Sequence, residues 1–159
     1  GSSTFYISSD GTKLYVADFN YVTSYNIAAN GQLTKIGQQF SSSFNNFMFM
    51  NNNGTKIISN SGDVYNEQFQ IQKSLGFSNT GMYNFSADGS KIVFGSNNNK
   101  IELYDGNSLN KIKSINVEVK NQTVNGLTPF FYNNELYCIV QAFDNNTFQQ
   151  SVLIIKKTI

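Results

Sequence analysis

The stretch SDGTKLYVAD, from Ser9 to Asp18, decides the fold of this chain. Its Asp10-Gly11 pair stands between two runs of strand-forming residues, Phe5 to Ile7 and Lys13 to Ala17. An Asp-Gly pair flanked by such runs is a strong hairpin signal, because a tight turn needs residues that tolerate a positive φ. The stretch therefore predicts a β-hairpin.

Two further strands follow this hairpin. They are Tyr21 to Ile27 and Leu33 to Phe40, and the turn between them ends on Gly31. Together the four strands predict an up-and-down unit of about 36 residues, which is too small to bury its own faces. The unit therefore needs neighbours of the same kind.

The unit recurs along the chain. An Asn133-Asn134 pair replaces Asp-Gly in the last copy, and asparagine also adopts a positive φ. The turn positions Gly11, Gly54, Gly89 and Asn134 lie 35 to 45 residues apart, as expected for four-stranded propeller blades. The last copy has a third strand, Phe148 to Lys157, but no residues for a fourth. The predicted blades are 4–40, 46–77, 82–119 and 129–159.

No segment shows a sustained helical spacing of apolar residues, so almost no helix is expected. Several strands, such as Leu14 to Ala17 and Ile92 to Phe94, are apolar on both faces, which is typical of a blade held between neighbours. The predicted fold is all-β: a single β-propeller domain, 1–159, of about four four-stranded antiparallel blades. It is either an incomplete ring, which finishes by self-association, or a fragment of a larger propeller.

The first copy, SDGTKLYVAD followed by VTSYNI and GQLTKI, resembles the YVTN-type β-propeller repeat. The third copy, SADGSKIVFGSNNNKIELYDGNSLNKI, is similar to the same repeat and shares the plan of WD40-type blades. The chain has no Trp, and therefore no WD dipeptide, and its second copy is shorter. The resemblance implies a radial stack of blades, a fold found in scaffolds, cell-surface modules and some enzymes, so it does not select a function.

Composition excludes several classes of site. The 11 basic and 10 acidic residues are scattered, so neither a nucleic acid nor an anionic membrane is expected as partner. The chain has no histidine, which excludes Ser-His and Cys-His pairs and histidine-ligated zinc within it. Cys138 lies in the apolar run LYCIV and is interpreted as a small buried strand residue. No apolar run approaches the roughly 18 residues of a membrane span, so no membrane insertion is expected.

The chain is rich in asparagine, with 24 residues, and only 13% of its residues are charged. A coding bias toward AT-rich codons and a neutral, hydrogen-bonding surface of a secreted protein both explain this composition. We expect a secreted or cell-surface location, and the chain opens like an excised or processed piece. Four Asn-x-Ser/Thr triplets agree with export, although chance alone gives several in such a sequence. They begin at Asn53, Asn84, Asn121 and Asn145.

The candidate ligand-binding residues are Asp18, Phe19, Asp63 and Asp144. In a propeller, the loops between second and third strands share a face with the connections between blades, and the three aspartates fall in such loops. Three converging carboxylates would hold a hard cation such as Ca²⁺; otherwise no cofactor is expected. Phe19 would stack on a sugar or a peptide. The alternative is that each aspartate binds its own backbone in a turn, as Asp and Asn do in loops.

No catalytic or phosphate-binding motif is present, so we expect a protein that is not an enzyme. The main hypothesis is a non-catalytic module that presents one propeller face to a protein or glycan partner. One alternative is a metal-dependent hydrolase of the propeller type, with its site at the channel mouth. Another is a structural part of a larger assembly that uses its open sheet edges.

Overall fold

The computed structural model describes residues 4–18, 20–40, 44, 48–59, 61–76, 82–96 and 98–159. These residues form antiparallel β-strands joined by turns, with no helix among them. Within this part of the chain, no helix therefore offers the length and hydropathy that a membrane span requires. The strands of each sheet follow one another in sequence order, so the predicted all-β, up-and-down architecture is confirmed.

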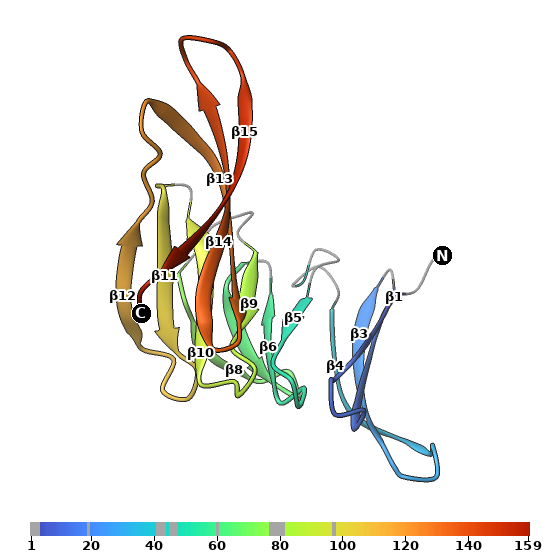
Figure 1. The fold of residues 1–159 in the computed structure, drawn as a ribbon. Helices are drawn as coiled ribbons and strands as arrows, with labels where there is room; N and C mark the ends of the chain where they lie inside the picture. Colours follow the sequence, from blue (N-terminus) through green and yellow to red (C-terminus); the bar gives the residue numbers. More distant parts are fainter. Residues whose placement is uncertain are drawn as a thin grey trace. The chain divides into compact units, whose positions relative to one another are not determined.

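The chain divides into two compact units, Gly1–Thr80 and Gly81–Ile159. The first unit holds two four-stranded sheets (Figure 1). One consists of β1 (Thr4–Ile7), β2 (Lys13–Ala17), β3 (Tyr21–Ile27) and β4 (Leu33–Phe40). The other consists of β5 (Met48–Met50), β6 (Lys56–Ser59), β7 (Asp63–Asn66) and β8 (Ile71–Ser74). The prediction of a single domain over all 159 residues stays a prediction.

The second unit holds one four-stranded and one three-stranded sheet (Figure 1). The first consists of β9 (Tyr83–Phe85), β10 (Lys91–Ser96), β11 (Lys100–Asp105) and β12 (Lys111–Asn116). The second consists of β13 (Gln122–Tyr132), β14 (Glu135–Asp144) and β15 (Gln150–Lys157). These three strands agree with the sequence analysis, which recognised a third strand but no fourth in the last copy.

Strand β13 begins ahead of the restart that we expected at residue 129. Pro129 lies inside this strand, where it pairs with Cys138 of β14. Proline has no amide hydrogen to donate and is therefore confined to edge strands, and β13 is an edge strand of its sheet. The proline therefore marks a sheet edge rather than the start of a strand.

The turn between β1 and β2 is fixed by its own side chains. The Ser8 Oγ accepts the Lys13 amide at 3.0 Å, and the Asp10 carboxylate accepts the Thr12 amide at 3.0 Å and hydroxyl at 2.8 Å. Gly11 has a φ of 70°, which explains why the sequence has glycine here. The hydrogen bond from the Ser8 hydroxyl has the largest effect in lowering the pKa of Asp10, and the two bonds from Thr12 lower it further.

The same turn recurs in the second and third sheets. Gly54 and Gly89 also have positive φ values, of 65° and 70°. Ser8 is matched by Asn51 and Ser86, which accept the amides of Lys56 and Lys91, and Asp10 is matched by Asn53 and Asp88. The fourth sheet replaces this turn by Asn133-Asn134, with φ values of 48° and 60°. The repeat predicted from the Asp-Gly signal is thus a repeat of hydrogen bonds.

Each unit has its own apolar core between its two sheets. In the first unit the core includes Tyr15 and Val22 from one sheet and Ile57 and Tyr65 from the other. In the second unit it includes Val93, Ile101, Leu103, Leu136, Cys138 and Val140. Cys138 is fully buried and free, so its interpretation as a core residue is confirmed.

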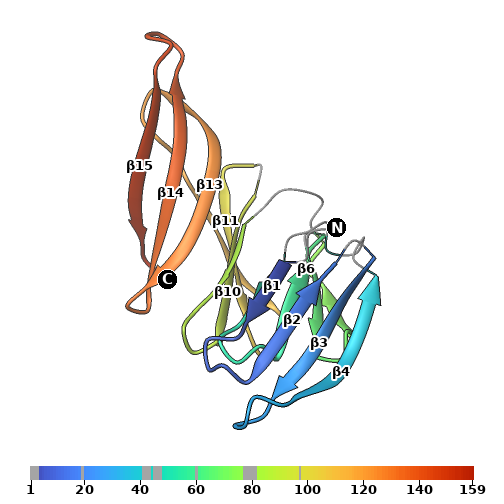
Figure 2. The ribbon, with the colours of Figure 1, turned by 90° about the vertical axis from the view of Figure 1, so that its right-hand side faces the viewer.

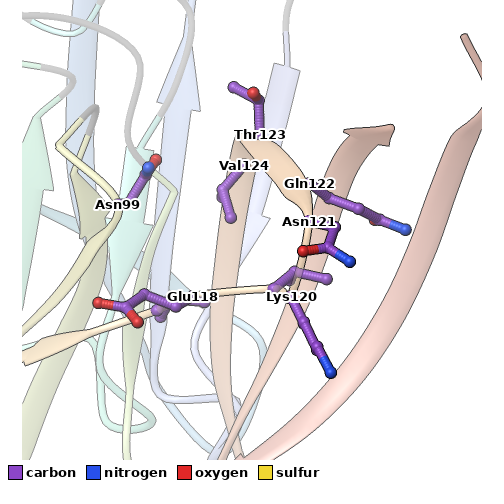
Figure 3. Close-up of a pocket in the computed structure, with 9 residues that line it drawn as sticks. Asn99, Glu118, Lys120, Asn121, Gln122, Thr123 and Val124 are labelled. Atoms are coloured by element: carbon purple, nitrogen blue, oxygen red, sulfur yellow. The ribbon is translucent and has the colours of Figure 1, made fainter. Parts of the chain in front are cut away.

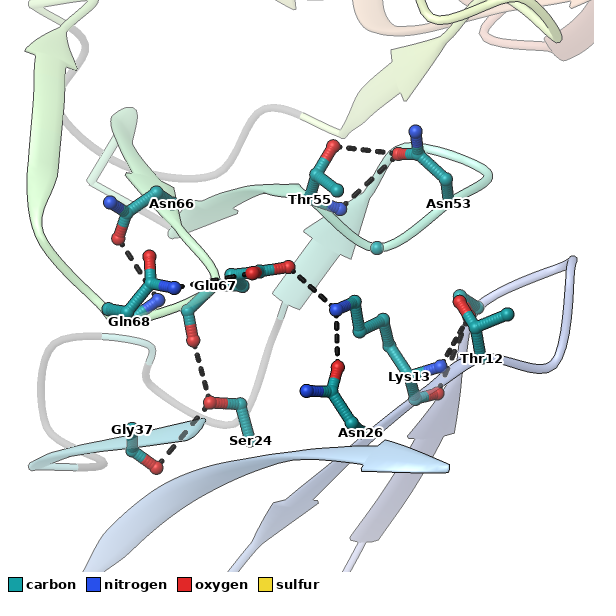
Figure 4. Close-up of polar contacts among 12 residues, drawn as sticks. Thr12, Lys13, Ser24, Asn26, Gly37, Asn53, Thr55, Asn66, Glu67 and Gln68 are labelled. Carbon is teal, nitrogen blue, oxygen red and sulfur yellow. Dashed lines mark hydrogen bonds and ion pairs between the residues drawn. The ribbon is translucent and has the colours of Figure 1, made fainter. Parts of the chain in front are cut away.

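Polar bonds join the two sheets of the first unit beside this core (Figure 4). The Lys13 Nζ forms an ion pair with Glu67 at 2.9 Å, and the Ser24 hydroxyl donates to the Glu67 carbonyl at 2.7 Å. Gly37 lies so close to Gln68 that a Cβ there would meet the Gln68 Cα at 3.0 Å. The sheets are therefore held at a short, specific distance.

Candidate functional site

A cleft of about 700 Å³ lies at one end of the strands of the second unit. Asn99, from the loop between β10 and β11, lines it together with residues 117–121, which connect β12 to β13, and residues 122–124 at the start of β13 (Figure 3). In an up-and-down sheet, the loop between second and third strands and the connection to the next sheet leave the strands at the same end. The cleft therefore lies on the face where the sequence predicted ligand binding.

Backbone hydrogen bonds shape this cleft. The Val117 amide donates to the Asn99 carbonyl at 2.8 Å, which ties the two segments together. The Gln122 amide donates to the Val119 carbonyl at 3.1 Å and closes a tight turn. Asn99 and Asn121 have φ values of 57° and 61°, a conformation that asparagine tolerates better than most residues. The asparagines thus have a structural reason to be here.

The floor of the cleft belongs to the apolar core. Val117 is 0% exposed and Val124 is 9% exposed, and both pack in the core cluster of the second unit. Gln122 is also held, because its side-chain oxygen accepts the Ser151 hydroxyl at 2.6 Å. The Thr123 hydroxyl accepts the side-chain amide of Asn145 at 2.9 Å. The backbone of the cleft is therefore anchored from below and from the side.

The rim of the cleft carries exposed polar side chains. Glu118, Lys120, Asn121 and Asn99 are all exposed, and Figure 3 shows the Glu118 and Lys120 side chains extending away from each other. A carboxylate, an ammonium group and side-chain amides can donate to and accept from a polar partner. The described lining residues include no paired nucleophile and base.

The predicted site residues are found in turns. The Asp18 Oδ1, between β2 and β3, accepts the amides of Asn20 at 2.8 Å and Tyr21 at 2.6 Å. The Asp63 Oδ2, at the start of β7, accepts the Ser61 hydroxyl at 2.9 Å. The first two bonds are those that the turn interpretation predicts. Ligand binding by these two carboxylates stays a prediction.

Asp144, at the end of β14, repeats the turn of another aspartate. Its Oδ1 accepts the amides of Asn146 at 2.8 Å and Thr147 at 3.1 Å, which lower its pKa. Asp105 of the third sheet accepts the amides two and three places ahead in the same way. In both turns the residue four places ahead has a φ of 57°. Asp144 lies between the second and third strands of its sheet, as predicted, but its turn has the hydrogen bonds of the turn between third and fourth strands at Asp105.

Two other predictions concern Phe19 and a bound metal ion. Phe19 lies outside the described residues. Among the residues that are described, no three His, Cys, Asp or Glu side chains gather into a group that could hold a metal ion. Calcium binding therefore stays a prediction, without support from a ligand cluster in the described part of the chain.

Sequence reasoning missed most of the cleft. Asn99 lies in a loop between second and third strands, the loop type expected on the ligand face, but Glu118 and Lys120 belong to a connection without any recognised motif. The available signal was the strand order, because the connection from one sheet to the next lies at the same end of the strands as the loops in which ligand binding was predicted. Had the start of β13 been placed correctly, residues 117–121 would have been recognised as that connection.

Comparison with solved structures gives the fold. The crystal structure of the RRP9 WD40 repeats is similar, with a TM-score of 0.58, 11% identity, and coverage of 96% of this chain and 51% of that chain. The crystal structure of Sqt1 from Saccharomyces cerevisiae has a TM-score of 0.57 and 16% identity, and the match covers 96% of this chain and 47% of that chain. The crystal structure of BamB from Moraxella catarrhalis has a TM-score of 0.57 and 15% identity, and the match covers 93% of this chain and 48% of that chain. The chain thus spans about half the length of the structures that it matches.

No family model and no curated protein sequence matches this chain. The resemblance to the YVTN-type repeat therefore stays a prediction, while the broader likeness to WD40-repeat propellers is borne out by the solved structures. At identities this low, the likeness concerns the fold alone. The chain is an all-β protein with the sheet architecture of β-propeller blades.

Proposed function

We propose that this chain is a non-catalytic interaction module that binds a protein partner through the cleft beside β13. The observation that carries the proposal is the pairing of a polar rim with a rigid floor: Glu118 and Lys120 are exposed above Val117 and Val124, which the core holds in place. A preformed surface loses little conformational freedom on binding, which favours affinity.

A protein fits the cleft better than a glycan. Side-chain amides and opposite charges at the rim match the amide groups and charged side chains of a polypeptide. Sugar sites, by contrast, commonly use aromatic rings as stacking surfaces, and none of the described lining residues is aromatic. The glycan alternative would therefore have to use another part of the molecule.

The hydrolase alternative has no support among the described residues. It needs several acidic side chains that converge on a metal ion or a reacting bond. No such group of metal-binding side chains occurs in the part of the chain that the structure describes. Cys138, the one thiol, is buried in the core, and burial raises its pKa to about 11, so it is not placed to act as a nucleophile.

We also propose that the protein is exported or displayed at the cell surface. The four asparagines that begin the Asn-x-Ser/Thr triplets, at 53, 84, 121 and 145, are all exposed, which supports this proposal. Mass spectrometry of the protein from its natural source tests it. An N-linked glycan at any of the four positions would support export, whereas unmodified asparagine at all four would contradict it.

Site-specific photo-crosslinking tests the binding proposal. Lys120 at the rim is replaced by benzoyl-phenylalanine, and the variant is expressed in the organism that makes the protein. We expect one discrete crosslinked protein after irradiation. The matched control carries the same replacement at Lys113, an exposed position on β12 that does not line the cleft.

The outcomes separate the candidate partners. A protein that is captured from position 120, is not captured from position 113, and is lost on Glu118→Lys would support the proposal. Equal capture from both positions, or no protein at position 120 together with specific binding on a glycan array, would contradict it. Equal melting temperatures of the two crosslinker variants would show that both are folded.

A further inference from the structure

The first sheet has one face that no described residue of its unit covers. Its other face, with Tyr6, Tyr15 and Val22, packs on the second sheet. On the free face, cross-strand pairs join Phe5 to Val16 and Ile7 to Leu14. Figure 2 views the β1–β4 sheet from this side.

This free face is apolar and exposed. Phe5 is 63% exposed, Ile7 is 62% exposed and Phe40 is 61% exposed, and the Phe40 ring stacks on Tyr21 with 5.0 Å between ring centroids. A sheet face of this kind is costly to leave in water, because the free energy falls when apolar surface is buried. Exposed apolar patches of this type mark interaction sites.

The three-stranded sheet also has an apolar free face. Its other face, with Leu136, Cys138 and Val140, lies in the core of the second unit. On the free face, Ile139 pairs with Ile154, which is 68% exposed, and Tyr137 stacks on Phe130 with 5.8 Å between centroids. The chain therefore carries one apolar free face on its first sheet and another on its last.

Within each unit, the sheets stack by unlike faces. The second strands of the first three sheets begin at Lys13, Lys56 and Lys91. Tyr15 is the second residue after Lys13, and Ile57 is the first residue after Lys56. Both pack in the core cluster of the first unit. Val93, two places after its lysine, faces the β13–β15 sheet. In each unit, the first sheet thus turns its Tyr15-type face toward the second sheet.

This rule makes the two free faces complementary. The free face of β1–β4 carries Leu14, which is one place after Lys13 and so corresponds to Ile57. In the second sheet, the corresponding face packs on the sheet that precedes it in sequence. One face of the β13–β15 sheet packs on the β9–β12 sheet, which precedes it in sequence. Its free face is the opposite one, which corresponds to the face that packs on a following sheet.

We propose that two copies of this chain associate head to tail, with the free β1–β4 face of each copy packed on the free β13–β15 face of the other. Length supports a second copy as the occupant, since one chain spans 47% to 51% of the propellers that it matches. Two copies supply twice the four sheets of one chain, at the upper end of the usual 4 to 8 blades.

Size-exclusion chromatography with light scattering tests the proposal on the chain as it stands. We expect a mass twice the 17.8 kDa of one chain. Ile7→Glu, which places a charge on the β1–β4 face, should convert the dimer to monomer. The matched control is Ile71→Glu: Ile71 lies on an edge strand of the same unit and is 61% exposed, close to the 62% of Ile7, and this variant should remain dimeric.

A mixing experiment tests the head-to-tail arrangement. Ile154→Glu should also abolish the dimer, because Ile154 lies on the second free face. A mixed pair of Ile7→Glu and Ile154→Glu chains has one contact without a substitution, so the mixture should form more dimer than either variant alone. A monomeric parent chain, a dimeric Ile7→Glu variant, a dimeric Ile154→Glu variant or a mixture that dimerises no better would each overturn the proposal.

Discussion

The hydroxyl of Tyr15 donates a hydrogen bond to the carbonyl oxygen of Gly54, across the two sheets of the first unit. Tyr15 is fully buried on β2, and burial, with a smaller effect of the Glu67 charge, raises the pKa of its phenol well above the usual value. Gly54 lies in the turn that repeats the hairpin of SDGTKLYVAD. One sheet is thus bonded to the turn that defines the next.

Tyr15→Phe should destabilise the protein by about 1–3 kcal/mol, because the buried Gly54 carbonyl would lose its partner without gaining water. Urea unfolding measures this change. The matched control is Tyr25→Phe on β3, since Tyr25 is only half buried and the described contacts include no hydrogen bond from its hydroxyl. A Tyr15→Phe variant as stable as this control would show that the bond does not contribute.

Gly95→Ala should destabilise the second unit by about 1–3 kcal/mol, the usual cost of overpacking. A Cβ at Gly95 on β10 would lie 2.4 Å from the carbonyl oxygen of Leu127 on β13, and backbone atoms cannot move aside easily. At Gly126 the nearest atom is the flexible side-chain oxygen of Gln141, at 3.1 Å, so Gly126→Ala should change stability by less than about 0.5 kcal/mol. Thermal unfolding of both variants tests the pair, and equal effects would contradict the close packing of β10 on β13.

Asp88→Asn should alter the acid stability of the chain. Hydrogen bonds from Ser86, and then from Ser90, lower the pKa of Asp88 to about 2, below the value of about 3.9 in an unfolded chain. A carboxylate with a lowered folded-state pKa contributes stability that is present above about pH 4 and is lost as the pH falls toward about 2. The parent should therefore be more stable than Asp88→Asn at pH 6, and this difference should vanish near pH 2.

Urea unfolding at several pH values measures that difference. Asparagine suits this turn sterically, because Asn53 already occupies the same position in the second sheet and accepts the Thr55 hydroxyl at 2.7 Å. The substitution therefore removes the charge while it keeps the turn. A stability difference that does not change between pH 6 and pH 2 would contradict the charge-assisted role of Asp88.

Cys138 should not react with a thiol reagent in the folded protein at pH 8. The thiol is fully buried, and burial raises its pKa to about 11, so it has neither access to solvent nor the reactive thiolate form. Ellman's reagent should label one thiol in denaturant and none in buffer over the same time. Rapid labelling of the folded chain would contradict the packing of β14 in the core.

The turns explain why so much of this fold was predictable. Asp10-Gly11 and its copies need a positive φ and two side-chain acceptors, and few residue types provide both, so the local sequence carries the signal. The start of β13 carried no such signal. Pro129 predicts a boundary near residue 129, but an edge strand tolerates proline, and only the pairing with β14 reveals that β13 continues through it.

The candidate site was less predictable for a related reason. Asp18 and Asp144 are candidates because they fall in loops expected to share one propeller face, and their carboxylates accept amides of their own turns. The cleft depends on where Asn99 meets the connection that contains Lys120, which is a matter of tertiary structure. Local sequence indicates at which end of the sheets ligand binding is predicted, but not which side chains meet there.

The central structural claim is that blade-type sheets repeat along the chain and that the last has only three strands. Residue-resolved hydrogen exchange tests it most directly. Amides all along β14, which has a neighbour on each side, should be protected like those of β11. Along the edge strand β15 only alternate amides should be protected, because only these point toward β14. Continuous protection of β15 would show that a further strand pairs with it and would contradict the account.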